Sequence, residues 1–225
     1  LSAASNYNYV VSSPYWSATR GAATLGSGTT GVVGTISSSN SIVGTTAYAV
    51  TNGSSYAGGD QVGSGGVRLL PNNQWVLLSP WWGSGKGAVT LMGVSQGTSG
   101  NITAANSLVG STAGTSYIGY FGPSNYGGDN VGNNAIAVLS ANGGSNFVVL
   151  SPAWGHYRGA VTYIDVTAPT VGAVSSSNSL VGSANGSLAN NIAYYNPTYY
   201  YYGGDQIGNG GNGAAVVTLP NNNYV

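Results

Sequence analysis

Cysteine, glutamate and charged residues in general are scarce or missing in this sequence. It has no Cys, which excludes a disulfide framework, a thiolate metal site and a cysteine nucleophile. Charged residues make up only 4% of its 225 residues, against about 25% in an average soluble domain. The formal net charge is zero, so the chain offers no electrostatic footprint for nucleic acid or for an anionic membrane surface. No apolar run approaches the roughly 18 residues of a membrane span, so we expect no membrane insertion.

Glycine is abundant, and the sequence repeats itself. The stretch 9–44 aligns without a gap with 75–110 and with 147–182, and a Gly-Gly-Asp landmark follows each copy. Internal repetition of this kind is typical of repeat architectures. No signal peptide is visible, so we expect a mature piece or a fragment of a longer array. We predict three repeats and the start of a fourth, at 1–74, 75–146, 147–223 and 224–225.

Each repeat contains four short β-type segments bounded by Gly, Asn, Ser or Pro. In the second repeat these are 74–79, 87–92, 106–110 and 135–139. They are rich in Val, Leu, Ile or aromatic residues, as expected for strands buried on both faces, and no stretch keeps helical spacing. Four strands in a tandem unit of about 70 residues predict an all-β fold of four-stranded blades of β-propeller type. A β-solenoid is the alternative, although its coils of about 20–30 residues would give a shorter period, which we do not find.

The stretch 58–93 resembles the FG-GAP repeat of integrin-type propellers. Val62-Gly63 stands where that family has Phe-Gly, Ser79-Pro80 stands at its Ala-Pro position, and Gly87-Ala88-Val89 opens the following strand. The chain is also similar to the tandem repeats of large secreted bacterial adhesin or hemagglutinin-like proteins. These resemblances imply a propeller fold and an adhesive role outside the cell.

Calcium is not expected in the turns of this chain. FG-GAP turns often carry an Asp-rich calcium loop, but the corresponding turns here hold no carboxylate; they are 71–74, 142–145 and 220–223. Calcium needs several carboxylate oxygens among its six to eight ligands. We therefore predict no metal and no other cofactor.

Six of the eight charged residues recur once per repeat. One acid stands in each Gly-Gly-Asp landmark and one base directly before each Gly-Ala; they are Asp60, Asp129 and Asp205, and Arg20, Lys86 and Arg158. One hypothesis is a set of charged ligand-binding sites. The other, which we favour, is structural: each Asp accepts backbone N–H groups in its Gly-rich loop and faces the base of the next unit.

One tryptophan per repeat follows the recurring Pro by two residues; these are Trp16, Trp82 and Trp154. They could be stacking platforms for sugar rings. Their fixed register favours packing wedges between neighbouring units, with each indole N–H donating to a carbonyl oxygen.

The connections between the Asn-Ser-x-Val-Gly and Gly-Gly-Asp motifs vary in length and are rich in tyrosine. They span 13, 16 and 20 residues, at 45–57, 111–126 and 183–202, and we predict surface loops on a rigid scaffold. Their aromatic residues are Tyr48, Tyr56, Tyr117, Tyr120, Phe121, Tyr126, Tyr194, Tyr195, Tyr199, Tyr200, Tyr201 and Tyr202. Such loops favour a contact surface on one face, for another subunit or a carbohydrate. Loops that pack only on themselves are the plainer alternative.

Catalytic constellations are missing from the sequence. His156 is the only His, and no two carboxylates lie near each other, so neither a Ser-His-Asp triad nor a glycosidase pair has its raw material. We therefore favour a non-enzymatic structural or adhesive repeat module of an extracellular or cell-surface protein. It would act through its Tyr-rich loops on another copy, a neighbouring repeat or a surface. A carbohydrate-binding, lectin-like propeller is the alternative.

Overall fold

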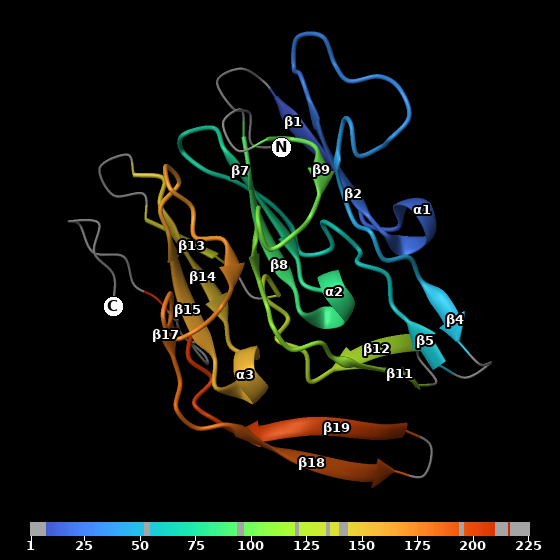
Figure 1. Cartoon of the computed structure of the whole chain (residues 1–225), viewed down its shortest axis with the longest axis vertical. Coiled ribbons are helices and arrows are strands. Elements are labelled where there is room, and N and C mark those ends of the chain that lie inside the picture. The colour runs from blue at the N-terminus through green and yellow to red at the C-terminus, as the bar shows by residue number, and fades with distance from the viewer. Residues whose placement is uncertain are drawn as a thin grey trace.

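The computed structural model contains three sheets of four or five strands that stand next to one another in sequence order, and three two-stranded sheets (Figure 1). It describes residues 8–51, 55–93, 97–119, 122–133, 136–139, 144–193, 196–209 and 216. The helical segments of this part of the chain are three four-residue turns, α1 (Trp16–Thr19), α2 (Trp82–Gly85) and α3 (Trp154–Tyr157). None of these is long or apolar enough to cross a membrane. The all-β prediction is confirmed, while the arrangement of the sheets as propeller blades stays a prediction.

The first sheet has the strand order β1-β2-β3-β9. Its antiparallel strands are β1 (Tyr9–Ser13), β2 (Ala22–Gly26) and β3 (Ile42–Val43). The fourth strand, β9 (Gly100–Asn101), runs parallel to β3 and comes from the second repeat. The first sheet is therefore completed by its neighbour along the chain.

The second sheet has the order β16-β10-β8-β7-β6 and collects strands from all three repeats. From the second repeat come β7 (Trp75–Ser79), β8 (Ala88–Met92) and β10 (Leu108–Val109). The first repeat adds β6 (Gly66–Leu69), which forms an antiparallel pair with β7, and the third adds β16 (Gly172–Ala173), parallel to β10. The four strands predicted for one repeat are therefore shared between consecutive sheets.

The third sheet repeats the pattern with the order β13-β14-β15-β17. Its strands are β13 (Ile136–Val138), β14 (Phe147–Ser151), β15 (Ala160–Ile164) and β17 (Leu180–Val181). All its pairs are antiparallel. Within the described residues β17 pairs only with β15, so it is the outer strand of this sheet.

The second sheet is buried on both of its faces. Val76 and Leu78 of β7 belong to a core cluster with Phe147 of the third sheet. Leu77, which lies between them, belongs to another cluster with Ile42 of the first sheet. Successive side chains of a strand point to opposite faces, so one strand supplies two cores. For β7 and β8 this burial confirms the expectation drawn from the nearly continuous apolar runs, whereas β1 of the first sheet has exposed residues.

Left-handed backbone marks the turns α1, α2 and α3. In α2 the φ angles of Gly83, Ser84 and Gly85 are 60°, 61° and 84°. In α1 the equivalent residues 17–19 have φ angles of 51°, 54° and 61° although none of them is glycine. Each non-glycine residue in this conformation costs roughly 1–2 kcal/mol, so contacts around the turn must stabilise it.

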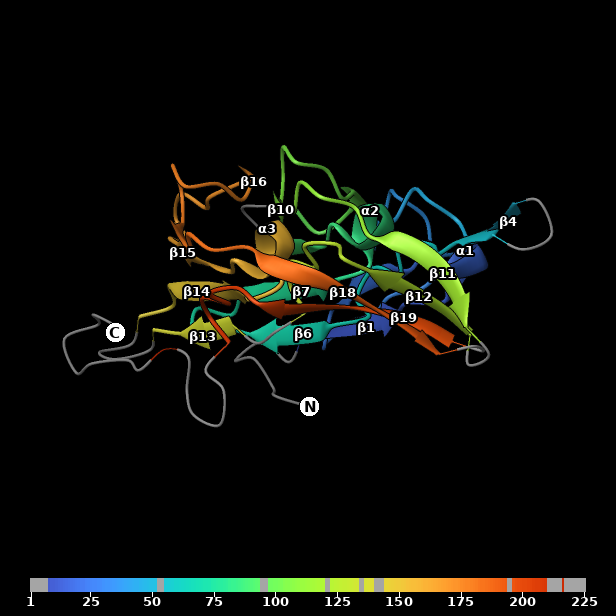
Figure 2. The ribbon, with the colours of Figure 1, turned by 90° about the horizontal axis from the view of Figure 1, so that it is seen from below.

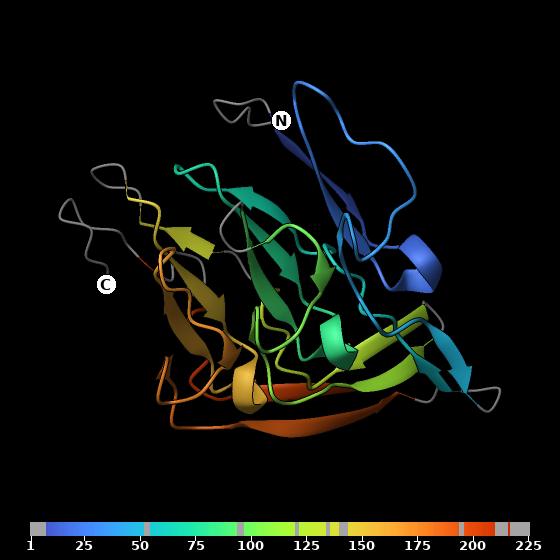
Figure 3. The ribbon, with the colours of Figure 1, turned by 45° about the horizontal axis from the view of Figure 1, so that its top comes forward.

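The three variable connections form β-hairpins along one side of the molecule. They are β4 (Ala49–Thr51) with β5 (Ser55–Ala57), β11 (Thr115–Gly119) with β12 (Gly122–Tyr126), and β18 (Gly186–Ala193) with β19 (Asn196–Gly203). They gather below the three sheets in Figures 1 and 3, and two of them face the viewer in Figure 2. The sequence predicts surface loops here; in the described residues the two halves of each insert pair with each other as antiparallel strands.

Candidate functional site

Three motifs meet at one junction in every repeat: the left-handed turn, the end of Asn-Ser-x-Val-Gly, and Gly-Gly-Asp. The carbonyl oxygens of the turn and of the base that follows it accept N–H groups from the insert after Asn-Ser-x-Val-Gly and from the residues after Gly-Gly-Asp. In the second repeat the pairs are Ser84 with Gly114 (2.8 Å), Gly85 with Asn130 (2.9 Å) and Lys86 with Val131 (3.0 Å). These hydrogen bonds hold the strained turn in place.

Close backbone contact explains why glycine recurs at this junction. A Cβ atom on Gly110 would lie 2.1 Å from the carbonyl oxygen of Lys86 and 2.7 Å from the Cβ of Asp129. On Gly87 it would lie 2.2 Å from the backbone nitrogen of Val131. Backbone atoms cannot move aside as a flexible side chain can, so any larger residue would force the segments apart.

The Asp of each landmark binds backbone amides across this junction. Oδ2 of Asp129 accepts the N–H groups of Ser111 at 2.7 Å and Thr112 at 2.8 Å. Its Oδ1 accepts the N–H of Gly155, in the left-handed turn of the third repeat, at 2.9 Å. Asp129 is only 1% exposed. A buried carboxylate is tolerated where hydrogen bonds replace its hydration, and here they come from two repeats.

Asp60 and Asp205 occupy the same position in their repeats. Asp60 is buried and accepts the N–H groups of Thr45 (2.7 Å), Thr46 (2.8 Å) and, in the next repeat, Gly83 (3.0 Å). Asp205 is exposed and accepts those of Ser183 (2.6 Å) and Ala184 (2.9 Å). Each carboxylate thus binds the start of the insert of its own repeat, and the first two also bind the following repeat.

Hydrogen bonds lower the pKa values of two carboxyl groups, those of Asp205 and Asp165. The N–H of Ala184, followed by the N–H and hydroxyl of Ser183, lowers the pKa of Asp205. The hydroxyl and then the N–H of Thr167 lower the pKa of Asp165, which lies outside the repeated motif. In both cases the donors stabilise the ionised form.

The side chains of the recurring bases contact residues of the left-handed turn that precedes each of them. Arg20 donates through Nε to Thr45 O (3.2 Å) and through Nη1 to Ser17 O (3.1 Å). The guanidinium carbon of Arg158 lies 4.9 Å from the centre of the Trp154 ring, a cation–π distance. The aliphatic stem of Lys86 lies over Gly83, where its Cδ would be 3.3 Å from an added Cβ.

The predicted pairing of each Asp with the base of the next unit is not observed in the described residues. The partner of Asp60 and of Asp129 in the next repeat is a backbone N–H, at the start of the turn that carries the base. The base follows three residues later along that turn and points to other groups. Each Asp does accept backbone N–H groups, as predicted. The donors belong to neighbouring motifs and not to the Gly-rich loop that carries the Asp.

Trp82 and Trp154 lie between neighbouring sheets. Trp82 is half-buried and packs against the cluster shared by the first and second sheets. Trp154 is buried in the cluster shared by the second and third. Trp16, in the first repeat, is half-buried. The indole Nε1 of Trp154 is buried without a hydrogen-bond partner in the described residues, so the expected bond to a carbonyl oxygen is absent there.

The tyrosines of the inserts lie in or beside the hairpins. Tyr48 precedes β4 and is half-buried, and its N–H donates to Ala18 O at 2.8 Å. The backbone of the others follows the strands: Tyr56 in β5, Tyr117 in β11, Tyr126 in β12, and Tyr199, Tyr200, Tyr201 and Tyr202 in β19. Tyr120, Phe121, Tyr194 and Tyr195 lie outside the described residues. Hairpin strands lengthen with the insert, from 3 to 5 to 8 residues.

The Ser of each Asn-Ser-x-Val-Gly motif is hydrogen-bonded to a Thr of the neighbouring strand, a contact that the sequence did not lead us to predict. In the second repeat Thr90 Oγ1 lies 2.7 Å from Ser107 Oγ, which donates to Asn106 Oδ1 at 2.9 Å. The same Thr–Ser pair lies at 2.7 Å in the other repeats, between Thr24 and Ser41 and between Thr162 and Ser179. Thr recurs two residues after each Gly-Ala pair in the sequence, and this recurrence could have indicated the contact.

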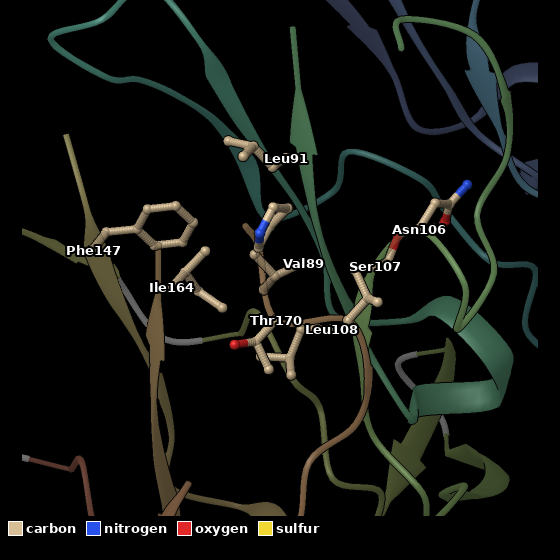
Figure 4. Close-up of a pocket in the computed structure, with 10 residues that line it drawn as sticks. Val89, Leu91, Asn106, Ser107, Leu108, Phe147, Ile164 and Thr170 are labelled. Atoms are coloured by element: carbon tan, nitrogen blue, oxygen red, sulfur yellow. Dashed lines mark hydrogen bonds between the residues drawn. The ribbon is translucent and has the colours of Figure 1, made fainter. Parts of the chain in front are cut away.

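The cavity between the second and third sheets is small and mostly apolar (Figure 4). Val89, Leu91 and Leu108 line it from one side, and Phe147 and Ile164 line it from the other. Its polar lining residues carry amide and hydroxyl groups and no titratable group. Among the described residues no group of three His, Cys, Asp or Glu could hold a metal ion. His156 is exposed in α3.

Sequence comparison matches the chain three times to one family. A family model described as a repeat of unknown function (DUF5650) matches residues 3–53, 69–120 and 141–190. Each match begins six residues before the first residue of β1, β7 or β14. No curated protein and no solved structure matches the chain. Nothing in this match links the chain to FG-GAP repeats, so that resemblance stays a prediction. The chain belongs to the DUF5650 repeat family.

Proposed function

We propose that this chain is a non-enzymatic structural and adhesive module of an extracellular or cell-surface protein, in which interlocked repeats present Tyr-rich hairpins for contact. The observation that carries the proposal is the placement of all three hairpins along one side of the sheets (Figure 1). The side chains and amides of the repeated motifs bind one another within the scaffold. The inserts are the part that differs between repeats, as expected for segments that meet partners.

The composition of the hairpins supports contact with a neutral partner. The three inserts contain no Asp, Glu, Lys, Arg or His and hold 12 of the 19 Tyr and Phe residues of the chain. Tyr offers a large contact area at a low entropic cost and is enriched in binding surfaces. Each hairpin is a two-stranded sheet within the described residues, so it also keeps outer strand edges that can pair with a partner strand.

The scaffold supports a mechanical role. Every sheet shares strands with its neighbour, and Asp60 and Asp129 bind amides of the following repeat. Repeat proteins of this kind gain stability from the contacts between adjacent units. We further propose that the sheets, of four or five strands each, are blades of propeller type.

The longest hairpin allows a direct test. Replacing Tyr199, Tyr200, Tyr201 and Tyr202 with Thr keeps β propensity and removes the aromatic rings. We expect unchanged thermal unfolding and a loss of binding to polystyrene, silica and glycan-coated surfaces, measured with a quartz crystal microbalance. The matched control replaces Ser187, Ala189, Asn190 and Asn191 of the paired strand β18 with Thr.

The outcomes separate the alternatives. Binding restricted to particular glycans and lost in the Tyr variant would favour the lectin-like function. Unchanged binding of the Tyr variant to every surface would contradict a contact role for this hairpin.

A further inference from the structure

The two ends of every insert are held together by the same backbone hydrogen bond. The N–H of the landmark Asp donates to the carbonyl oxygen of the second residue of the insert: Asp60 to Thr46 at 3.0 Å, Asp129 to Thr112 at 3.1 Å, and Asp205 to Ala184 at 3.1 Å. The segments that these bonds enclose are 47–59, 113–128 and 185–204, which have 13, 16 and 20 residues. The closing bond is therefore the same for segments of three different lengths.

The scaffold also holds the start of each insert. Oδ2 of each landmark Asp accepts the N–H groups of the first two residues of its insert. In the second repeat the N–H of the fourth residue, Gly114, donates to Ser84 O in the left-handed turn at 2.8 Å. In the first repeat Tyr48 donates in the same way to Ala18 O at 2.8 Å. We call the landmark Asp and the left-handed turn of one repeat its insert clamp.

The insert clamp binds the main chain and makes little use of insert side chains. Its one side-chain contact with the insert in the described residues is the hydroxyl of the first residue, which donates to the Asp Oδ2 from Thr45 (3.4 Å), Ser111 (3.1 Å) and Ser183 (3.0 Å). The fourth residue differs in type: it is Tyr48, Gly114 or Gly186. Every residue except Pro has a backbone N–H and C=O, so the clamp can hold inserts of many sequences.

The length of an insert is as unconstrained as its sequence. The entropic cost of closing a loop grows only logarithmically with its length, and the added residues pair with one another. The three hairpins are separate two-stranded sheets, and no ladder joins one to another in the described part of the chain. Each hairpin leaves the scaffold beside the left-handed turn of its own repeat (Figures 1 and 3).

We propose that the insert clamp is a socket for interchangeable hairpins, and that each insert is a separate recognition element. What a repeat binds is then set within residues 47–57, 113–126 or 185–202. The proposal rests on the proposed function, in which the hairpins make the contacts, and assigns specificity to single repeats and not to one shared surface. Because the inserts carry no charged residue, their partners are uncharged surfaces or polymers, and repeats with different inserts bind different ones.

An exchange of two inserts tests the socket. Residues 113–126 and 185–202 trade places in one chain, so the composition and every insert clamp are kept. We expect the amides of Thr112 and Asp129, which lie outside the exchanged segments, to exchange with solvent as slowly as in the unmodified chain, measured by hydrogen-exchange NMR. A second chain, in which 47–57 replaces 113–126, tests the same amides with a shorter hairpin.

Asp205→Ala in the unmodified chain is the matched control for the amide measurement. It removes the carboxylate that binds the N–H groups of Ser183 and Ala184. These two amides should exchange faster, while those of Thr112 and Asp129 should not change. The control therefore shows what the loss of one insert clamp looks like in a folded chain.

Binding decides whether recognition moves with the insert. The unmodified and exchanged chains are compared on polystyrene, silica and glycan-coated surfaces. The exchanged chain should bind the same surfaces, and replacing the four residues of Tyr199–Tyr202 with Thr should abolish that binding from either position. A chain that carries 113–126 in both the second and the third repeat should lose it as well.

Two results would overturn the proposal. If the clamp amides lose their protection in both chains with altered inserts, the scaffold depends on the particular insert it holds. If binding that depends on Tyr199–Tyr202 disappears in a folded exchanged chain, the hairpins act as one surface. An unmodified chain that binds no surface contradicts the proposed function and the recognition role with it, whereas protected amides would still establish the socket.

Discussion

Oδ1 of Asp129 accepts the backbone N–H of Gly155 at 2.9 Å, and this bond joins the second repeat to the third. The same carboxylate binds Ser111 and Thr112 of its own repeat. One buried side chain therefore fixes the left-handed turn of the next unit and the base of its own hairpin. Interlocked strands and carboxylate bridges together make each repeat depend on its neighbours.

Asp129→Ala should destabilise the chain by about 3 kcal/mol or more, because three amides lose a charged acceptor and a buried unpaired donor costs roughly 1–3 kcal/mol. Asp205→Ala is the matched control and should cost less, because Asp205 is exposed. Chemical denaturation of both variants measures the difference. Equal losses would contradict a bridging role for Asp129.

Thr19→Gly should stabilise the chain by about 1 kcal/mol. Thr19 has a φ of 61°, a conformation that costs a non-glycine residue roughly 1–2 kcal/mol. Its Oγ1 is buried without a partner in the described residues, so removing the hydroxyl sacrifices no hydrogen bond there. The second repeat already has glycine, Gly85, at this position. Thr112→Gly, where φ is not positive, should destabilise the chain under the same thermal assay.

Trp154→Ala should cost about 3–5 kcal/mol, the range for truncating a large aromatic side chain in a core. Trp16→Ala should cost clearly less, because Trp16 is only half-buried whereas Trp154 is buried. Urea denaturation of the two variants compares equivalent residues at an inner and an outer position. If both cost the same, packing between neighbouring sheets does not explain the recurrence of Trp.

Stability of the third repeat should fall in acid. The pKa of Asp205 is lowered by the N–H groups of Ala184 and Ser183, so its stabilising contribution is complete above the ordinary Asp pKa of about 3.9. It is lost as the pH falls through the lower, folded-state pKa. Thermal unfolding followed through this range should show a steeper loss in the unmodified chain than in Asp205→Asn, and a carboxyl NMR titration should give a midpoint below the ordinary value.

The sequence predicted more of the scaffold than of its connections. The repeats, the all-β class and the buried strands of the second repeat could be predicted from the sequence, because apolar runs and recurring motifs are local signals. The amide partners of Asp129 lie 17, 18 and 26 residues away, and no local pattern identifies them. We predict loops for the inserts because their length varies between repeats, and length variation does not reveal whether the two halves of an insert pair with each other.

Composition and periodicity by themselves determined that this chain builds one β-rich unit three times with few charges. Only the tertiary structure decided that the units share strands, because β9 and β16 are two residues long and too short to show a period. It also decided that each buried carboxylate binds backbone and not a base. Once three backbone segments pack so closely that only glycine fits between them, amides are the donors within reach.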